Sequence, residues 1–500
     1  MAHQSMAVID LGSNSGRVVV LDVDDHGSIE ILADGRSPLR LARDVAPTGR
    51  LSNDAIDRVL GALRDFEAIA SGNRAVRTVA VATAAIREAA NGDDLLTRIR
   101  AETGIEIRVI DGAEEARLGF LGAVYSLPVQ HGTVTDIGGG SMELSRFRDR
   151  RLVGSFTLAV GALRMSDRYL ASDPPAAGEL EALAASVRRT LQEQDVPPLK
   201  ADERLIGTGG TIRNLAKIDR SARAYPIPRL DGYVLGRKRV QDLVSVLSGR
   251  RLSRRQVMAG LNADRADSIV GGAVVAVTTM ETLGADEVVV SGRGLREGLA
   301  FDSIGAHLPS PQSVRRTSIA ALASRFASWD RGRAERRAAI AARLLLALEP
   351  AAGPSQEERL DQAATVLDVG RSIDFYRRHE HTADILVASD LAGFTHRKLA
   401  WLAAIVRQAG DEEMSVRLYR PLLGPDDAEP VARAGAILDL ADEIEQRVAP
   451  GRGLGVSCEV RGREVHLAAP IFDPARRARL DARFRRAFRR RLVVTPMVGS

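Results

Sequence analysis

Two short segments of this chain combine an aspartate with glycine and hydroxyl-bearing residues, and they are related to each other. Val8–Ser15 and Val134–Ser141 carry the same residue at four of eight matched positions, including the aspartate and one glycine. A glycine-rich turn after a strand exposes successive backbone N–H groups, which bind anions. An aspartate at the strand end can hold a divalent cation directly or through water. A single loop of this kind can be an ordinary tight turn, but a repeated pair predicts a site for phosphate and metal.

The candidate residues of this site divide by chemistry. Asp10 and Asp136 are candidate metal ligands, and Glu143 can reach the same ion from the start of the next strand. Because all three offer hard oxygen ligands, we expect Mg²⁺ or Mn²⁺. A third loop, Gly207–Thr211, opens a helix whose N-terminus favours an anion. The expected phosphate-binding residues of the three loops are Ser13, Asn14, Ser15, Gly138, Gly139, Gly140, Ser141 and Gly209.

Two further positions carry charged groups that suit phosphoryl transfer. Arg87 follows a predicted strand, where a guanidinium can clamp a phosphate with two hydrogen bonds, although a helix-surface arginine is an equal alternative. Glu114 and Glu115 open a helix, and one carboxylate there can deprotonate an attacking water. Acidic residues are also favoured in a first helical turn by the helix dipole, so the residue types alone leave both glutamates open.

The predicted elements around these loops alternate between strands and helices. Each copy of the repeat reads as a strand, a loop and a hairpin, and helices such as 51–71, 114–125 and 265–283 separate the later strands. Alternation of this kind predicts α/β lobes. Two lobes with duplicated loops predict a cleft between them.

The remainder of the chain has a different texture. Helical, Ala- and Arg-rich sequence runs to about residue 448, glycine and proline break it at 450–453, and 455–469 alternates like a small sheet. We therefore expect domains at 1–128, 129–306, 307–448 and 449–500. A basic helix is predicted at 473–491, docked through Leu480, Phe484 and Phe488. Its arginines are expected to form an exposed positive face that is simply solvated, attracts nucleic acid, or guides a long polyanion.

Composition limits the class of protein. The chain has 500 residues, a net charge of +5 and a lone cysteine, Cys458, which excludes an internal disulfide and a cysteine-rich metal site. Its apolar runs fall short of the roughly 20 residues that span a bilayer, and the first residues do not read as a signal peptide. We expect a cytoplasmic protein with no membrane partner and no specific nucleic-acid partner.

The chain resembles the exopolyphosphatase and guanosine pentaphosphate phosphatase (Ppx/GppA) family, within the acetate kinase, Hsp70 and actin superfamily. Six segments occur in the family's order, namely Asp10–Ser15, Ala82–Arg87, Asp111–Arg117, Asp136–Glu143, Gly207–Thr211 and Ser291–Gly298. The resemblance implies two duplicated ribonuclease H-like lobes, an HD-like all-α domain and a small α+β C-terminal domain. It also implies a homodimer, to which the Ala- and Leu-rich stretch 319–348 could contribute an interface.

The resemblance further implies roles for the candidate residues. Glu115, rather than Glu114, would be the catalytic base, and Arg87 would clamp phosphate. Asp136, Glu143 and Asp10 would carry Mg²⁺. The substrate would be inorganic polyphosphate or, as the alternative, guanosine pentaphosphate (pppGpp). In the HD-like part, Leu367 stands where a histidine would precede Asp368, so we expect no second metal site there.

Two rival functions share the same sequence features. The fold alone does not decide between a phosphatase and a sugar or acetate kinase. The glutamate of the Glu-Ala-Arg stretch argues against the kinase. A non-catalytic polyphosphate or alarmone sensor needs no base and is disfavoured by Glu115, Asp136 and Glu143 together.

Overall fold

The computed structural model describes residues 4–23, 29–305, 308–410, 416–449 and 456–497. The chain divides into two compact units, the first formed by 1–224 and 230–314 and the second by 225–229 and 315–500. The expected boundary at 306 and the expected break at 450–453 lie outside the described residues, and the four-part division stays a proposal. In the described part of the chain, no helix is both long and apolar enough to cross a membrane.

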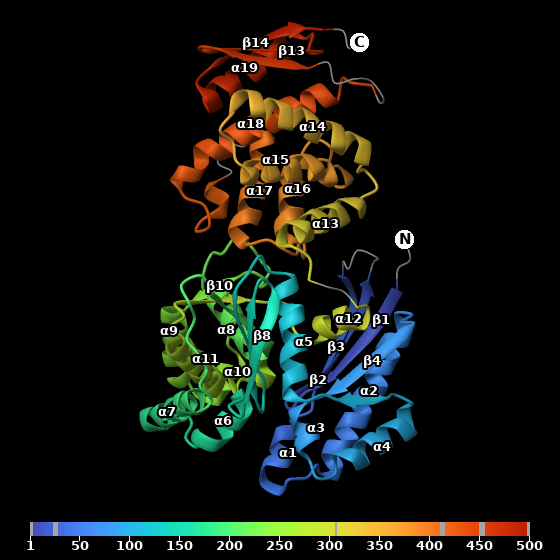
Figure 1. Ribbon diagram of the computed structural model, residues 1–500, viewed down its shortest axis with the longest axis vertical. Helices are drawn as coiled ribbons and strands as arrows, with labels where there is room; N and C mark the ends of the chain where they lie inside the picture. Colours follow the sequence, from blue (N-terminus) through green and yellow to red (C-terminus); the bar gives the residue numbers. More distant parts are fainter. Residues whose placement is uncertain (1–3, 24–28, 306–307, 411–415, 450–455, 498–500) are drawn as a thin grey trace. The chain divides into compact units, whose positions relative to one another are not determined.

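The first unit contains two sheets with one topology, here called lobe I and lobe II (Figure 1). In lobe I, β1 (Gln4–Leu11) pairs antiparallel with β2 (Ser15–Val23) and parallel with β4 (Arg77–Ala82). In lobe II, β6 (Gly132–Ile137) pairs in the same way with β7 (Met142–Arg148) and β9 (Arg204–Thr208). Lobe I has the strand order β3 (Ile29–Pro38), β2 (Ser15–Val23), β1 (Gln4–Leu11), β4 (Arg77–Ala82), β5 (Ile107–Val109). Lobe II has the order β8 (Arg151–Leu158), β7 (Met142–Arg148), β6 (Gly132–Ile137), β9 (Arg204–Thr208), β11 (Glu287–Val290), β10 (Val234–Gly236).

The sequence repeat accounts for this shared topology. β1 is the central strand of its sheet and carries a continuous buried run, Met6–Ile9, as expected for a strand covered on both faces. The repeated aspartates end the equivalent central strands: Asp10 lies opposite Arg17 on β2, and Asp136 lies opposite Glu143 on β7. The arrangement fits the actin-like α/β fold expected from the sequence.

Helices pack around both sheets. Those of lobe I are α1 (Leu41–Thr48), α2 (Asn53–Gly72), α3 (Ala84–Glu88), α4 (Gly92–Thr103) and α5 (Gly112–Tyr125). Those of lobe II are α6 (Ala162–Tyr169), α7 (Ala177–Glu193), α8 (Gly209–Ser221), α9 (Arg237–Ser248), α10 (Leu252–Gln256), η1 (Ala263–Arg265), α11 (Ile269–Leu283) and α12 (Leu295–Ser303).

Two of these helices link the lobes. α5 packs against β6, β7 and β8, and α12 packs against β1 and α5. Their backbones approach closely at two glycines: a Cβ on Gly122 would lie 2.0 Å from the Gly294 carbonyl oxygen, and one on Gly298 would lie 1.8 Å from that of Leu118. No larger residue fits there without moving a helix, so this crossing fixes the connection between the lobes.

The second unit is mainly helical. Its helices are α13 (Pro311–Ser324), α14 (Arg331–Leu348), α15 (Pro354–Val366), η2 (Val369–Ser372), α16 (Arg378–Ala388), α17 (His396–Ala409), η3 (Arg417–Tyr419), η4 (Pro425–Asp427), α18 (Ala428–Glu445) and α19 (Pro474–Phe488). Its sheet has the order β12 (Ser457–Arg461), β13 (Glu464–Ala469), β14 (Arg491–Pro496). One apolar core runs through both parts, because Leu467 and Val494 of the sheet pack in the same cluster as Ile340 and Leu402 of the helices.

The C-terminal helix differs from the expectation in two respects. It ends at Phe488, where Arg489 adopts a left-handed conformation, and 491–496 forms strand β14 instead of continuing the helix. Leu480 and Phe484 are buried as expected, but Arg483 is buried too, so it does not belong to an exposed positive face. Its guanidinium pairs with Asp439 of α18 at 2.7 Å, and Arg479 pairs with Glu443 at 3.0 Å. The basic face is thus used partly to dock on an acidic stripe of α18.

The stretch 319–348, which was expected to contribute to a dimer interface, places apolar side chains in the core of the second unit. Ile319, Ile340, Leu344 and Leu348 are buried in the unit's own core, whereas Leu346 is exposed. The homodimer stays a prediction, and these buried side chains do not supply its surface.

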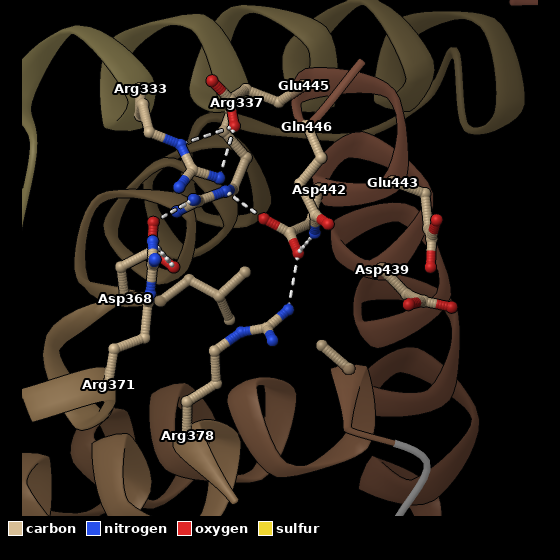
Figure 2. A network of polar contacts seen from close by, with 12 residues as sticks. Arg333, Arg337, Asp368, Arg371, Arg378, Asp439, Asp442, Glu443, Glu445 and Gln446 are labelled. Carbon is tan, nitrogen blue, oxygen red and sulfur yellow. Dashed lines mark hydrogen bonds and ion pairs between the residues drawn. The ribbon is translucent and has the colours of Figure 1, made fainter. Parts of the chain in front are cut away.

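A network of arginines and carboxylates lies inside the helical part (Figure 2). Arg337 is fully buried; it donates to Asp442 at 2.8 Å and to the Ala364 carbonyl at 2.9 Å, and it also pairs with Asp368. Burial raises the pKa of Asp442, but Arg337 and Arg378 outweigh it and hold that pKa below its usual range. Asp368, the aspartate compared with that of an HD motif, therefore faces an arginine. The HD-like character of this domain stays a proposal.

We predict that Arg337→Met lowers the free energy of unfolding of the second unit by about 3–5 kcal/mol, because it leaves two buried carboxylates without their shared partner. Urea unfolding followed by circular dichroism measures this change. Arg377→Met is the matched control: its pair with Glu380 is exposed, and such pairs contribute about 0–1 kcal/mol. Equal effects of the two substitutions would contradict the assigned importance of the buried network.

Candidate active site

The loop between β1 and β2 is fixed by the chain that follows β3. Leu39 and Arg40 donate backbone N–H groups to the Asn14 carbonyl at 3.0 and 2.9 Å, and Ala42 donates to that of Ser13 at 3.0 Å. These bonds engage carbonyl oxygens that would otherwise repel an anion. The side chains of Ser13, Asn14 and Ser15 are largely buried.

The loop between β6 and β7 is held in the same way by the start of α6. Ala162 donates its N–H to the Gly138 carbonyl at 2.9 Å, Arg164 to that of Gly139 at 3.0 Å, and Gly161 to that of Gly140 at 3.2 Å. The two loops also share one internal bond, from Gly12 to Ser15 and from Gly138 to Ser141. The duplication therefore extends from the strands to the support of each loop.

The two loops lie against each other. A Cβ on Gly139 would lie 3.0 Å from the Cβ of Asn14, and one on Gly140 would lie 3.2 Å from the Oγ of Ser13. The third loop joins them through Gly209, which has a φ of +79° and whose Cβ would lie 2.2 Å from Oδ1 of Asp136. All three predicted loops therefore meet in one place. Glycine is required at Gly209, whereas a side chain at Gly139 or Gly140 would need a small shift of the facing loop.

One cavity of about 110 Å³ collects nearly all the predicted site residues. Its lining includes the predicted metal ligands, the predicted phosphate-binding residues and Glu115. Arg87 lies beside this cavity: its Nη1 is 3.7 Å from Oε2 of Glu115 and donates to the Ile110 carbonyl at 2.5 Å.

The structure separates the two candidate glutamates. Glu114 pairs with Arg108 at 2.5 Å and lies 3.8 Å from Arg117, both partly exposed. Glu115 turns to the cavity and is mostly buried. Asp111 caps the helix by accepting from the Glu114 N–H at 2.8 Å, and this cap fixes the first turn that carries both residues. Position alone therefore makes Glu115 the candidate that can meet a ligand.

The carboxylates of the cavity are held in a costly arrangement. Burial raises the pKa of Asp10 to about 6, and burial with repulsion from Asp136 raises that of Glu143 to about 8. Burial, followed by the charges of Glu143, Asp10 and Asp136, raises the pKa of Glu115 well above its usual range. Buried like charges of this kind are stabilised by a cation among them.

Orphaned oxygen atoms test whether a metal fits. Oδ1 of Asp10, Oε1 of Glu143 and Oε2 of Glu115 are buried without a hydrogen-bond partner among the described residues. Buried polar atoms rarely lack a hydrogen-bond partner. The carboxylate oxygen atoms of Asp10 and Glu143 are hard ligands of the type that Mg²⁺ or Mn²⁺ binds. Asp136 lines the same cavity, so the donor atoms there are of the type that suits a divalent cation, but among the described residues no three such side chains are already gathered closely enough to hold one.

Four arginines that were not singled out from the sequence complete the lining, namely Arg17, Arg213, Arg265 and Arg296. Burial, then the charges of Arg213 and Arg296, lowers the pKa of Arg17. The guanidinium of Arg265 lies on Gly210, whose Cβ would come within 2.1 Å of it. A signal for Arg17 existed, because it occupies the place in the first repeat that Glu143 occupies in the second. Arg213 and Arg265 reach the cavity through tertiary packing, for which no local pattern exists.

The arrangement has defined chemical capacities. Backbone amides, hydroxyl groups and guanidinium groups can hold phosphate oxygens, and charge-assisted bonds to them are the strong ones. The carboxylates can hold a cation, and a buried glutamate with a raised pKa can accept a proton near neutral pH.

Comparisons with known proteins identify the family of the chain. Residues 19–307 match the model of the Ppx/GppA phosphatase family, and residues 314–447 match that of Ppx/GppA phosphatase, domain III. The chain is 31% identical over 318 residues to Exopolyphosphatase 1 of Mycobacterium tuberculosis strain H37Rv, covering 63% of this chain and 92% of that protein. It is 32% identical over 323 residues to Exopolyphosphatase 2 of the same strain, covering 61% and 100%.

Solved structures of the same family also match the chain. A crystal structure of the Aquifex aeolicus Ppx/GppA family member matches with a TM-score of 0.53 and 27% identity, over 61% of this chain and 98% of that one. An exopolyphosphatase from Cytophaga hutchinsonii matches with a TM-score of 0.56 and 26% identity, over 61% and 100%. The chain therefore belongs to the Ppx/GppA phosphatase family and is a hydrolase.

Proposed function

We propose that this chain is an exopolyphosphatase, which releases the terminal phosphate of inorganic polyphosphate with the help of Mg²⁺ or Mn²⁺. The observation that carries the proposal is a single cavity whose glycine-rich loops and four arginines suit a chain of phosphate groups and whose carboxylates suit a cation. The names of the mycobacterial relatives support the same substrate.

The chemistry follows from the residues around the cavity. The loops of Ser13–Ser15 and Gly138–Ser141 would hold the terminal phosphate. Glu115 would accept a proton from the attacking water while the oxygen of that water bonds to the terminal phosphorus. The bond from that phosphorus to the bridging oxygen breaks, and its electron pair leaves with the shortened chain. Arg87 would orient Glu115 and clamp a phosphate oxygen, and the four lining arginines would neutralise the phosphates that follow.

Three carboxylates would hold the metal ion, namely Asp10, Asp136 and Glu143. When bound, the ion would neutralise charge on the phosphate oxygens and so favour attack by water.

We predict that Glu115→Gln lowers the rate of phosphate release by about 10²- to 10⁴-fold, the range for loss of a general base, while substrate binding persists. Steady-state hydrolysis and equilibrium binding of polyphosphate measure the two quantities separately. Glu114→Gln is the control, because its carboxylate pairs with Arg108 at the surface. Near-normal activity of Glu115→Gln with loss in Glu114→Gln would place the base one residue earlier.

Polyphosphate is favoured over pppGpp by the lining of the cavity. Among the described residues, that lining has a leucine, Leu295, and no aromatic ring on which a base could stack. Because stacking contributes about 1–3 kcal/mol per base, we predict a kcat/KM about tenfold or more in favour of polyphosphate over pppGpp.

A side-by-side assay of both substrates with Mg²⁺ tests the proposed function. Equal or faster hydrolysis of pppGpp would favour the alternative, a pppGpp 5′-phosphohydrolase. Release of phosphate from neither substrate would favour the non-catalytic sensor. The HD-like domain and the homodimer stay proposals from the family resemblance, and a cytoplasmic location stays a proposal from the composition of the chain.

A further inference from the structure

Ion pairs connect the two lobes beside the phosphate loops. Arg36 of β3 pairs with Asp264. Arg40 reaches Asp267 at 2.9 Å, and Arg43 of α1 reaches Asp167 and Asp267, each at 3.1 Å. Lobe I supplies every cation of this set and lobe II every anion. A further pair runs in the opposite sense, from Arg164 of α6 to Glu88 of α3 at 2.8 Å. We call these pairs together the clasp.

Two members of the clasp also hold the phosphate loops. Arg40 donates its backbone N–H to the Asn14 carbonyl in lobe I, while its side chain pairs with lobe II. Arg164 donates its backbone N–H to the Gly139 carbonyl in lobe II, while its side chain pairs with lobe I. Each loop is therefore tied through one residue to the opposite lobe.

The backbone of Arg40 supports a special role. It has a φ of 55°, in the left-handed region that non-glycine residues rarely adopt. Such a conformation persists where the surrounding bonds determine it, and here these are the backbone bond to Asn14 and the side-chain bond to Asp267.

We propose that the clasp sets the distance between the two phosphate loops, with Arg40 and Arg164 as positioning residues for the site. The loops touch through Gly139 and Asn14, so a phosphate can be held from both sides only while the lobes are closed. The consequence for hydrolysis rests on the proposed function; the closure itself does not.

The exposure of the clasp shows how it acts. The side chains of Arg40 and Arg43 are 37% exposed, that of Asp167 is 45% exposed, and that of Asp267, which both arginines contact, is 19% exposed. Pairs that are partly exposed in this way are individually weak and are screened by salt. Together they bias the lobes toward closure and still allow opening, while the crossing of α5 and α12 keeps the lobes connected. High salt should therefore open the cleft.

A distance measurement tests the closure without using activity. Spin labels are attached in the full-length chain at Asp65→Cys on α2 and Glu193→Cys on α7, with Cys458→Ser to remove the native thiol. Pulsed electron paramagnetic resonance then reports the distance between the lobes. We expect one short distance at low salt, and a longer, broader distribution at high salt or in Arg40→Gln/Arg164→Gln.

A charge exchange distinguishes pairing from a general structural role. Arg164→Glu alone, which faces Glu88, should open the lobes, and Arg164→Glu/Glu88→Arg should restore the original distance. Failure of the exchange to restore it, or an unchanged distance in Arg40→Gln/Arg164→Gln and at high salt, would overturn the proposal.

Kinetics of the same variants separate this proposal from the proposed function. For polyphosphate hydrolysis we expect kcat/KM to fall by about fivefold for each single Gln variant and by about 20-fold for the double variant, as the loss of weak pairs implies. If the distances change as expected but no variant, including the wild type, releases phosphate, the clasp stands and the proposed function fails. If the wild type is active but neither the distance nor kcat/KM responds to the substitutions, the proposed role of the clasp is wrong and the proposed function stands.

Discussion

The enclosure of carboxylates and of arginines in one cleft, each set repelling within itself, is the constraint on which the first unit depends. Asp10, Asp136, Glu143 and Glu115 share this cleft with four arginines. The fold keeps them there because the repeated strands end at the cleft and the loops between the strands are held by backbone bonds from the following segments. The close glycine contacts leave little room for relaxation. A cation would relieve the repulsion among the carboxylates, and phosphate groups would relieve the repulsion among the arginines.

The second unit shows that burial alone does not produce this situation. Asp442 is as deeply buried as the carboxylates of the cleft, yet its pKa is lowered, because Arg337 and Arg378 contact it directly. Asp10 and Glu143 have raised pKa values and oxygen atoms without partners among the described residues. Asp442 is thus neutralised by direct contacts, whereas Asp10 and Glu143 keep oxygen atoms available to a ligand. Asp439 of the second unit also has a pKa raised by burial, but it is paired with Arg483 at 2.7 Å. This contrast is the physical basis for placing the binding site in the first unit.

The two copies of the repeat differ at one position that faces the cleft. The repeated aspartates face different partners across their hairpins, since Asp10 lies opposite Arg17 and Asp136 lies opposite Glu143. Lobe I therefore contributes a carboxylate and a guanidinium group at this place, and lobe II contributes two carboxylates.

Much of this cleft could be predicted from the sequence, because the repeat is local and its loops follow recognisable strands. The residues that could not be predicted reach the site through tertiary packing: Arg213 and Arg265 come from helical segments whose local pattern says nothing of a cavity. The choice of Glu115 over Glu114 needed the family resemblance, and the structure supplies the physical reason in the surface pair of Glu114 with Arg108.

The C-terminal helix shows the opposite limit of sequence patterns. Spacing placed Arg483 on a positive face, but it could not show that Asp439 and the Ala409 carbonyl oxygen lie against that face. The end of the helix at Phe488 was also missed. There the next residues pair with β13, and Asp481 accepts from the Leu492 N–H at 2.8 Å. Contacts between segments distant in sequence decided both points.

The most direct test of the account is the melting temperature of wild type and Glu143→Gln at pH 8, each with a chelator and with Mg²⁺. If the cleft holds unbalanced carboxylates that await a cation, Mg²⁺ raises the wild-type Tm by binding the folded state. Glu143→Gln then melts at a higher temperature than wild type in the chelator, because a buried charge has been removed, and it loses most of the response to Mg²⁺. A variant that melts lower than wild type in the chelator, or that keeps the full Mg²⁺ response, would contradict the account.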